Sequence, residues 1–324
     1  MMNKLKLYAT AIFSELFIPL SAVAVECGDT ITSPTTLTED LICAVTEQDQ
    51  VVLTVEGPSG LLDMGGYQLT CIDEDNLAEA AILLNGTGAQ VFNGSVTGCR
   101  DGIVALGEGS HSIYSMTLTD MFGDLIYVET NNTVVRDNTL SITQSGDGAE
   151  LRGDYNTVTR NTIIDIDNSG IELRGLFNNI SFNTISGSGN QGIEVNGQFT
   201  NVFSNIVTDG LNDGIAVGEG DEFDNADFPT VSLNHVSGNV GLGIPVRLTS
   251  NTLITQNVVE SNTEGGIGIF IEGSEFNKIV RNTSLNNSPY DLEDDTDPGD
   301  CSGTNTWVFN TFATAEPAWN KVNL

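Results

Sequence analysis

The sequence predicts an all-β fold of the parallel β-helix (solenoid) type, and three observations support this. Segments that begin at Asn156, Asn178 and Asn201 share one pattern: asparagine, a short β-branched run, asparagine, a second run, a Gly/Asn/Asp turn and a Gly-Ile-x-aliphatic strand. Apolar residues alternate with polar ones within the runs, as in strands, and no stretch keeps a helical period. A repeat of constant length in this range indicates a solenoid, whose coils bury their apolar side chains against their neighbours.

The second asparagine of each repeat sets the period. It recurs with spacings of 23, 22, 22, 29, 23 and 25 residues, at Asn138, Asn161, Asn183, Asn205, Asn234, Asn257 and Asn282. Three short strands therefore form a coil of about 22 residues, and we expect about nine coils at a rise of about 4.8 Å. Asparagine suits this position because it tolerates the left-handed conformation of a turn. Stacked asparagine side chains can also hydrogen-bond along the axis.

The chain divides into four expected segments: a signal peptide at 1–24, an N-terminal cap at 25–60, the β-helix at 61–295 and a C-terminal cap at 296–324. Lys4 and Lys6 precede an apolar run that ends in Ala22-Val23-Ala24, a pattern typical of a cleaved export signal. Caps are expected because an open coil end exposes unpaired strand edges. No later apolar stretch is long enough to span a bilayer.

Export would place the five cysteines in an oxidising compartment. An odd number leaves at least one cysteine without an intramolecular partner. We expect Cys27 to pair with Cys43 in the N-terminal block, and Cys71 with Cys99 about one coil further on, with Cys301 free. Other connectivities remain open, because spacing alone does not determine pairing.

The pattern N-x-V-x-x-N-x-I…G-I-x-L resembles the repeat of right-handed parallel β-helices of the pectate-lyase-like superfamily. More narrowly, it resembles secreted β-helix repeat proteins of the periplasmic copper-binding type that serve nitrous-oxide reductase maturation. The opening Cys27-GDTIT and the closing Tyr290-Asp291-Leu292 with Asn305-Thr306-Trp307 resemble the ends of such proteins. The resemblance implies a right-handed helix over nearly all of the mature chain.

Two features of the sequence depart from what that resemblance implies. Only two histidines, His111 and His235, are present, so a copper or zinc site built from histidine is not expected. Proteins of the resembled group are also expected to carry, near the C-terminus, a second cysteine shortly after a proline. In this chain Pro317 is followed by Ala318 and Trp319 instead. The second departure favours a free Cys301.

Aligning the coils on the glycine before the third strand predicts which side chains point outward. Ile171 and Leu173 then face the core, so that Glu172 and Arg174 face solvent. The first outward column reads Val104, Ile126, Glu150, Glu172, Glu194, Ala216, Pro245 and Phe270. The second reads Leu106, Val128, Arg152, Arg174, Asn196, Gly218, Arg247 and Glu272. We expect a stack of three glutamates beside two arginines, and an apolar patch formed by Val104, Leu106, Ile126 and Val128.

The candidate catalytic residues are therefore Glu150, Glu172, Glu194, Arg152 and Arg174. Carboxylates about 4.8 Å apart repel one another, which raises the pKa of one of them. Adjacent pairs suit a retaining glycosidase and alternate pairs suit an inverting one. The alternative is a surface ion-pair ladder that arose by repeat duplication and has no catalytic role.

Two acidic loops are candidate metal sites. Asp221, Asp224 and Asp227 lie in the 29-residue coil, and Asp291, Glu293 and Asp295 lie near the C-terminal cap. Clustered carboxylates suit Ca²⁺, which takes six to eight oxygen ligands. The alternative is a pair of solvated acidic loops without metal.

The charge balance restricts the possible partners. The chain carries 44 Asp+Glu against 11 Lys+Arg, a formal charge of −33. Such a chain lacks the cationic clusters that nucleic acids or an anionic membrane surface require.

Two hypotheses for function remain. The first is an exported β-helix that binds a polysaccharide, a cell-surface glycan or another surface ligand, or serves as a rigid rod, without an evident catalytic motif. The alternative is a carbohydrate-active enzyme, a polysaccharide lyase or glycoside hydrolase, that uses the Glu/Arg column. Ca²⁺ is the one cofactor that the sequence suggests.

Overall fold

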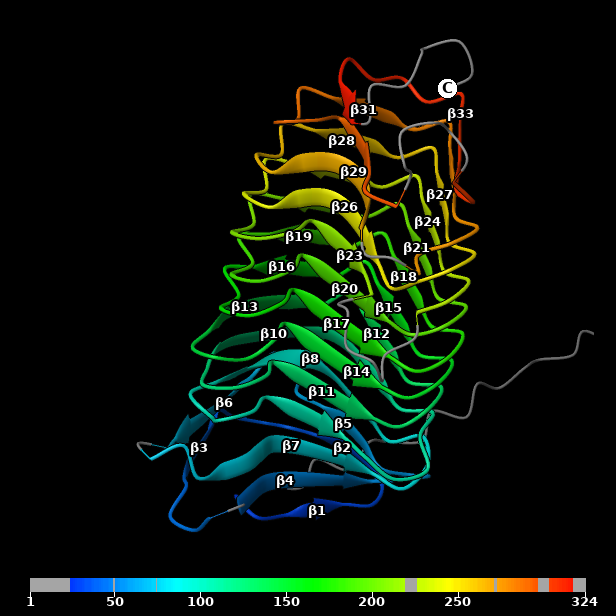
Figure 1. The fold of residues 1–324 in the computed structure, drawn as a ribbon. Coiled ribbons are helices and arrows are strands. Elements are labelled where there is room, and N and C mark those ends of the chain that lie inside the picture. Colours follow the sequence, from blue (N-terminus) through cyan, green and yellow to red (C-terminus); the bar gives the residue numbers. More distant parts are fainter. Residues whose placement is uncertain are drawn as a thin grey trace, which may run out of the picture.

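The computed structural model describes residues 24–48, 50–73, 75–218, 226–270, 273–296 and 303–316. These residues form a parallel β-helix, seen from the side in Figure 1, in which each coil contributes to three stacks of parallel strands. The expected signal peptide, apart from Ala24, and Cys301 lie outside the described residues. Within the described ranges, no helix is long and apolar enough to cross a membrane.

Within the described residues the front sheet contains 13 strands, and each turn of the chain leads from one of them to the next. They are β1 (Thr30–Ile31), β4 (Gln50–Glu56), β7 (Ala78–Asn85), β9 (Ile103–Ala105), β11 (Ile126–Glu129), β14 (Ala149–Arg152), β17 (Ile171–Arg174), β20 (Ile193–Asn196), β23 (Ile215–Val217), β26 (Leu242–Arg247), β29 (Gly265–Phe270), β32 (Leu292–Asp294) and β34 (Ala315–Glu316).

The second ladder follows the front sheet in each coil. It consists of β2 (Pro34–Thr36), β5 (Leu61–Asp63), β8 (Gln90–Thr97), β10 (Ser112–Met121), β12 (Val134–Arg136), β15 (Thr157–Thr159), β18 (Asn179–Ser181), β21 (Asn201–Phe203), β24 (Thr230–Ser232), β27 (Leu253–Thr255), β30 (Lys278–Val280) and β33 (Thr306–Val308).

The third ladder closes each coil. It consists of β3 (Leu41–Ala44), β6 (Gln68–Ile72), β13 (Thr139–Thr143), β16 (Thr162–Ile164), β19 (Thr184–Ser186), β22 (Ile206–Thr208), β25 (His235–Ser237), β28 (Val258–Glu260) and β31 (Thr283–Leu285). The long strands β8 and β10 pass round the corner and pair in both the second and third ladders.

The coil count is higher than the sequence suggested, at about 12 turns rather than nine. Strands form within the segments expected to be caps: β1, β2 and β3 stack on β4, β5 and β6. At the other end β33 and β34 stack on β30 and β32. Coil pairing therefore begins before the asparagine repeat does and continues after it.

The core is a set of columns of aliphatic side chains, one from each coil. In the third ladder Ile163, Ile185, Val207, Val236 and Val259 occupy equivalent positions and are at most 1% exposed. Their neighbours along each strand point outward because successive side chains of a strand alternate between its two faces. Each coil thus buries its apolar groups against the coils on either side.

A buried asparagine ladder runs along the axis at the predicted positions. The Asn161 Oδ1 accepts hydrogen bonds from the backbone N–H and the Nδ2 of Asn138, both at 3.0 Å. The Asn161 Nδ2 in turn donates to the Val135 carbonyl at 3.1 Å and to Asn183 Oδ1 at 3.0 Å. The same bonds continue to Asn282, and Asn310, which the sequence reasoning missed, extends the ladder by one coil.

One of the two reasons given for asparagine at this position is wrong. None of the ladder asparagines has a positive φ; the left-handed residue is the one before it, for example Asp137 (φ 57°), Arg160 (φ 55°) and Phe182 (φ 58°). The ladder residue is asparagine because its side chain bonds backbone groups of the preceding coil and the asparagine side chain of the next coil. The second of these contacts is the other reason proposed, hydrogen bonding between stacked side chains along the axis.

A second left-handed corner, between the front sheet and the second ladder, carries an aromatic stack. Tyr155, Phe177, Phe199 and Phe228 have φ values of 55–63°, and successive ring centroids lie 4.9–5.2 Å apart with nearly parallel planes. Stacking between rings offsets part of the cost of a left-handed conformation in residues that have a Cβ.

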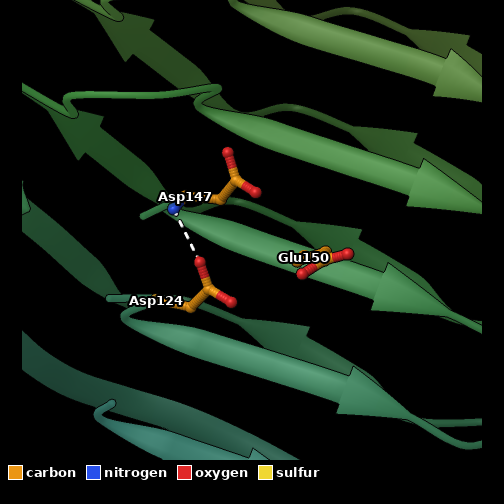
Figure 2. A group of neighbouring side chains, drawn as sticks. All are labelled: Asp124, Asp147 and Glu150. Carbon is orange, nitrogen blue, oxygen red and sulfur yellow. Dashed lines mark hydrogen bonds between the residues drawn. The ribbon is translucent and has the colours of Figure 1, made fainter. Parts of the chain in front are cut away.

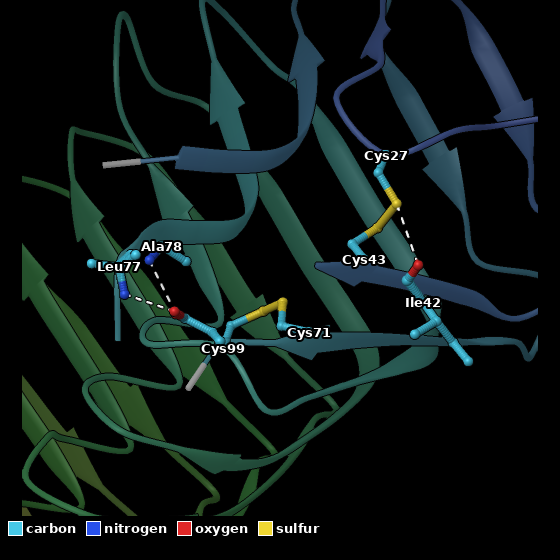
Figure 3. The surroundings of a disulfide bond; sticks show 8 residues. Cys27, Ile42, Cys43, Cys71, Leu77, Ala78 and Cys99 are labelled. Carbon is cyan, nitrogen blue, oxygen red and sulfur yellow. Dashed lines mark hydrogen bonds between the residues drawn. A yellow bond between two sulfur atoms is a disulfide. The ribbon is translucent and has the colours of Figure 1, made fainter. Parts of the chain in front are cut away.

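The structure contains two disulfides, Cys27–Cys43 and Cys71–Cys99, as the spacing suggested (Figure 3). Cys43 and Cys71 are register partners on the neighbouring strands β3 and β6. The two disulfides therefore crosslink the first coils of the β-helix one after the other. Crosslinks of this kind stabilise a fold mainly by restricting the unfolded chain.

Replacing Asn183 by leucine tests the ladder. The change leaves the Asn161 amide groups, the Val158 carbonyl and the Asn205 Oδ1 without the partners that Asn183 provides. We expect the free energy of unfolding to fall by about 2–4 kcal/mol, because buried unsatisfied groups cost about 1–3 kcal/mol each. Chemical denaturation followed by circular dichroism measures this. The control is Asn201→Leu, at an exposed asparagine, which should change stability by less than about 0.5 kcal/mol; equal effects would contradict a special role for the ladder.

Candidate functional site

The predicted glutamate column is present on the front sheet. Glu150 is the register partner of Glu172, and Glu172 of Glu194. All three side chains are largely covered, at 7–8% exposure. The column therefore consists of stacked, partly desolvated carboxylates rather than freely solvated ones.

Each glutamate is held by the residue two positions further along its own strand. The Arg152 Nε donates to Glu150 Oε1 at 2.6 Å and the Arg174 Nε to Glu172 Oε1 at 2.8 Å. Asn196 donates its Nδ2 to Glu194 in the same way. Arg152 and Arg174 thus lie beside the glutamates as expected, already engaged in charge-assisted hydrogen bonds.

The apolar patch expected from Val104, Leu106, Ile126 and Val128 does not exist. Ile126 and Val128 are fully buried in the core, and Tyr127 is the outward partner of both Val104 and Glu150. The alignment failed because this coil has Leu125 where the others have glycine, and a one-residue slip moves every side chain to the opposite face.

A second register error lies at the other end of the column. Phe270 is the partner of Arg247 rather than of Pro245, and Gly268 stands opposite Pro245. Phe270 therefore belongs to the second outward column.

An aspartate column beside the glutamates escaped the sequence reasoning. The Oδ1 of Asp101, Asp124 and Asp147 each accepts a backbone N–H from the next coil, at 3.0, 2.7 and 2.7 Å. Asp213 does the same further along the axis, at 2.7 Å. The sequence signal was an acidic residue directly before the strand-opening position, as in Asp147-Gly148 and Asp213-Gly214.

The two columns meet in a cluster of Asp124, Asp147 and Glu150, drawn in Figure 2. One carboxylate oxygen of each residue lies within 4.8 Å of the others. Asp147 is 3% exposed, and burial, with the charges of Asp124 and Glu172, raises its pKa to about 8. Burial also raises the pKa of Asp124 to about 6, with the neighbouring charge of Asp101 acting in the same direction.

The cluster therefore retains a proton near neutral pH. Burial raises the pKa of Glu150 as well, whereas its hydrogen bond from Arg152 opposes the rise. Because the three groups interact strongly, the proton belongs to the cluster rather than to a single residue.

A pocket of about 320 Å³ opens beside the cluster, at the lower end of the usual size range of ligand sites. Its wall combines cationic, anionic and aromatic side chains: Arg100, Asp101, Phe122, Gly123, Asp124, Tyr127, Ser145 and Gly146. The Tyr127 hydroxyl donates to Glu129 Oε2 at 3.0 Å, and the Arg152 guanidinium lies 5.6 Å from the ring centroid. The pocket thus offers hydrogen-bond donors, acceptors and a ring face.

The candidate metal ligands of the acidic loops can be followed only where the structure describes them. Asp221 and Asp224 lie outside the described residues, and the Asp227 Oδ1 accepts the Ser250 N–H at 2.7 Å. Both oxygens of the buried Asp291 accept hydrogen bonds, from Asn287 on one side and from Ala313 and Thr314 on the other.

The last two predicted ligands differ in their surroundings. Glu293 is half-buried, which raises its pKa, with the charges of Asp295 and Glu316 contributing. Asp295 is exposed. In the part of the chain that the structure describes, Asp124, Asp147 and Glu150 are the three acidic groups that converge closely enough to share a divalent cation.

Comparison with known proteins supports the fold. Residues 80–228 match the model of a right-handed β-helix region, and residues 198–314 match that of the periplasmic copper-binding protein NosD. No curated protein matches the sequence.

Several solved structures are similar over most of their length. The A-module of the Azotobacter vinelandii mannuronan C-5 epimerase AlgE6 has a TM-score of 0.64 at 15% identity, over 90% of this chain and 92% of that one. The periplasmic alginate epimerase AlgG scores 0.62 at 16% identity, over 82% and 74%. A mutant tailspike protein of E. coli bacteriophage HK620, in complex with a hexasaccharide, scores 0.54 at 11% identity, over 86% and 66%.

The chain therefore has the right-handed parallel β-helix fold that the resemblance of its repeat implied. At these identities the solved structures define the fold and do not define an activity.

Replacing Asp147 by asparagine tests the buried cluster. Because the pKa of Asp147 is raised in the folded state, its contribution to stability is complete below the ordinary value of 3.8 and is lost as pH rises towards about 8. Asparagine keeps the acceptor for the Ser169 N–H but carries no charge. We expect the melting temperature at pH 8 to rise by roughly 2–6 °C and its dependence on pH between 4 and 9 to flatten.

The matched control is Asp213→Asn. Asp213 accepts a backbone N–H in the same way but is paired with Arg247 at 2.9 Å, so losing its charge should not stabilise the fold. Scanning calorimetry over the pH range measures both variants. Equal stabilisation by the two changes would refute a proton held by the cluster that contains Asp147.

Proposed function

We propose that the protein is an exported β-helix that binds a glycan on its front sheet, in the pocket beside Asp124 and along the column of Glu150, Glu172 and Glu194. The observation that carries the proposal is the pocket itself. It brings Arg100 and Tyr127 together with Asp124, one member of the carboxylate cluster, on one face of a rigid scaffold.

The groups on this face suit a ligand rich in hydroxyl groups. Carboxylates accept hydrogen bonds from sugar hydroxyls, whereas arginine and tyrosine donate to sugar oxygens. The Tyr127 ring supplies an apolar surface for the ring of a sugar. Because the coils repeat along the axis, an extended chain lying along the front sheet would meet similar groups in successive coils.

Fold neighbours also support a glycan. The epimerases carry mannuronan and alginate in their names, and the bacteriophage tailspike is described with a hexasaccharide. A similar fold at this level of sequence identity does not identify a substrate. The proposed ligand class therefore depends on the chemistry of the front sheet of this chain.

Charge favours a neutral or amino-bearing glycan over a polyuronate. Arg152 and Arg174 are paired with glutamates of the same face, and the chain as a whole carries −33. An anionic polymer would meet repulsion along its whole length unless divalent cations such as Ca²⁺ bridged the carboxylates.

Export agrees with the two disulfides and with the match to a periplasmic family model. The histidines do not favour the copper function in that model's description. The Nε2 of the buried His111 contacts the Leu106 carbonyl at 2.7 Å, and the His235 Nε2 lies 3.0 Å from Glu260 on the exposed third ladder.

A carbohydrate-active enzyme is the second candidate, and one observation favours it. Asp124 borders the pocket with a pKa raised to about 6, and burial raises the pKa of Glu150 as well, although the hydrogen bond from Arg152 opposes that rise. Glycoside hydrolysis uses one carboxylic acid that keeps its proton and one carboxylate that does not. In this alternative Asp124 is the general acid and Glu150 the nucleophile or base.

Binding to a glycan array with neutral, amino-bearing and acidic polymers tests the first proposal. We expect Tyr127→Ala and Arg100→Met to weaken binding at least tenfold, because each removes a wall of the pocket. The control, Glu260→Gln on the third ladder, should bind like the wild type. Binding that survives both pocket substitutions would rule out this site.

Turnover separates the binder from the enzyme. If the protein cleaves a glycan, Asp124→Asn and Glu150→Gln should each lower the rate by about 10²–10⁴-fold, the usual contribution of an acid or base. Release of reducing ends or unsaturated products measures the rate. Binding without turnover would support the non-catalytic role, and turnover unaffected by both changes would exclude the proposed acid and base.

A further inference from the structure

The aspartate column is interrupted in two successive coils. Asp147 precedes the interruption and Asp213 follows it. The two positions between them are occupied by Ser169 and Gln191. These residues are in register, because the N–H of Gly170, which follows Ser169, donates to the Gln191 carbonyl at 2.9 Å. A hydroxyl and a primary amide therefore stand on neighbouring coils where the rest of the column has carboxylates.

The Ser169 hydroxyl lies beside two side-chain oxygens of the next coil. Its Oγ donates to Gln191 Oε1 at 3.2 Å and lies 3.4 Å from Glu194 Oε2, on strand β20. All three side chains are buried: Ser169 is 0% exposed, Gln191 3% and Glu194 8%. A hydroxyl, an amide and a carboxylate thus form a close group from which bulk water is excluded.

This group combines a nucleophile, an electrophile and a base. A serine hydroxyl becomes nucleophilic when an adjacent base accepts its proton. Glu194 is oriented for that role, because its other oxygen, Oε1, accepts a hydrogen bond from the Asn196 Nδ2. A nucleophile, a base and a third group that orients the base are the arrangement that covalent catalysis uses. The carbonyl carbon of Gln191 is one bond away from the oxygen that the hydroxyl contacts, so a small side-chain rotation brings it within reach.

We propose that Ser169 and Gln191 join in an intramolecular ester that crosslinks neighbouring coils. The Ser169 Oγ attacks the Gln191 Cδ and gives its proton to Glu194. The new C–O bond forms and the C–N bond of the amide breaks. Glu194 passes the proton to the leaving nitrogen, which departs as ammonia. The chain loses one NH3 in all, and the step consumes no oxidant, reductant or other co-reactant.

The surroundings of the two groups favour the ester. The fold holds the reactants in contact, and such positioning corresponds to effective molarities of up to about 10⁵–10⁸ M. Ammonia is diluted into bulk solution, so the reverse reaction lacks its second reactant. Hydrolysis requires water at the ester carbon, and the burial of Ser169 and Gln191 excludes it.

The ester adds a covalent link in the middle of the β-helix. In the part of the chain that the structure describes, the two disulfides join the first coils only. The ester connects positions directly before β17 and β20, 22 residues apart along the chain. A crosslink between neighbouring coils restricts the unfolded chain and opposes separation of the coils. This inference does not rest on the proposed glycan binding, and its test measures a mass rather than a ligand.

Mass spectrometry of the purified full-length protein tests the proposal. After reduction of the disulfides, we expect an intact mass about 17 Da below the value calculated from the observed N-terminal residue onward, which is the loss of one ammonia molecule. Trypsin cleaves after arginine and lysine, so peptides 161–174 and 175–247 should appear as one crosslinked species. Mild alkali, which hydrolyses esters faster than amides, should separate them.

Three substitutions should abolish the crosslink. Ser169→Ala and Gln191→Met each remove a reacting group, and Glu194→Gln removes the base. The intact mass of each variant should equal its calculated value, and the two tryptic peptides should be separate. The matched control is Ser188→Ala: Ser188 is also a buried serine, and its Oγ has no hydrogen-bond partner among the described residues. This control should retain the mass deficit and the crosslinked peptide.

Two results would overturn the proposal. A wild-type mass equal to the calculated value would leave the contact between Ser169 and Gln191 as a hydrogen bond only. A mass deficit that persists in Ser169→Ala would assign the loss of ammonia to another reaction. One such reaction is succinimide formation at an Asn-Gly step such as Asn196-Gly197, which releases ammonia without Ser169.

Discussion

The hydrogen bonds that run along the axis from each coil to the next are the interactions on which the whole structure depends. The asparagine ladder satisfies backbone groups inside the corner between the second and third ladders, and the aspartate column does the same at the edge of the front sheet. Both keep neighbouring coils in register. Register in turn decides which side chains face the core and which form the surface columns.

Much of the fold could be predicted because each sequence repeat corresponds to one coil of the β-helix. The asparagine spacing gave the coil length and the ladder, and the alternation within the runs gave the core-facing residues. The coil count was low because the first coils lack the repeated asparagine and are recognisable only through their pairing, as with β1 on β4, and because Asn310 near the other end was missed. A coil that pairs with its neighbour but lacks the repeated residues has no recognisable sequence pattern.

The candidate site was predictable only in part, for a related reason. Glu150, Glu172 and Glu194 lie in regular coils, so alignment placed them correctly. Tyr127 lies in the coil where Leu125 replaces glycine, and there alignment on glycine failed by one residue. The Asp124–Asp147 contact joins residues of different coils, and an acidic residue before the strand-opening position indicates the column without indicating which carboxylates meet.

The coil of Leu125 and Tyr127 has a consequence for how such a molecule acquires specificity. Duplicating a regular coil extends each surface by one identical row, which lengthens a face without distinguishing any point on it. The pocket of Arg100, Phe122 and Tyr127 lies where the repeat is broken. A binding site at one defined position along the β-helix therefore arises from an irregular coil, whereas the regular coils determine the length of the molecule. The binding site and the length can then change separately as the sequence diverges.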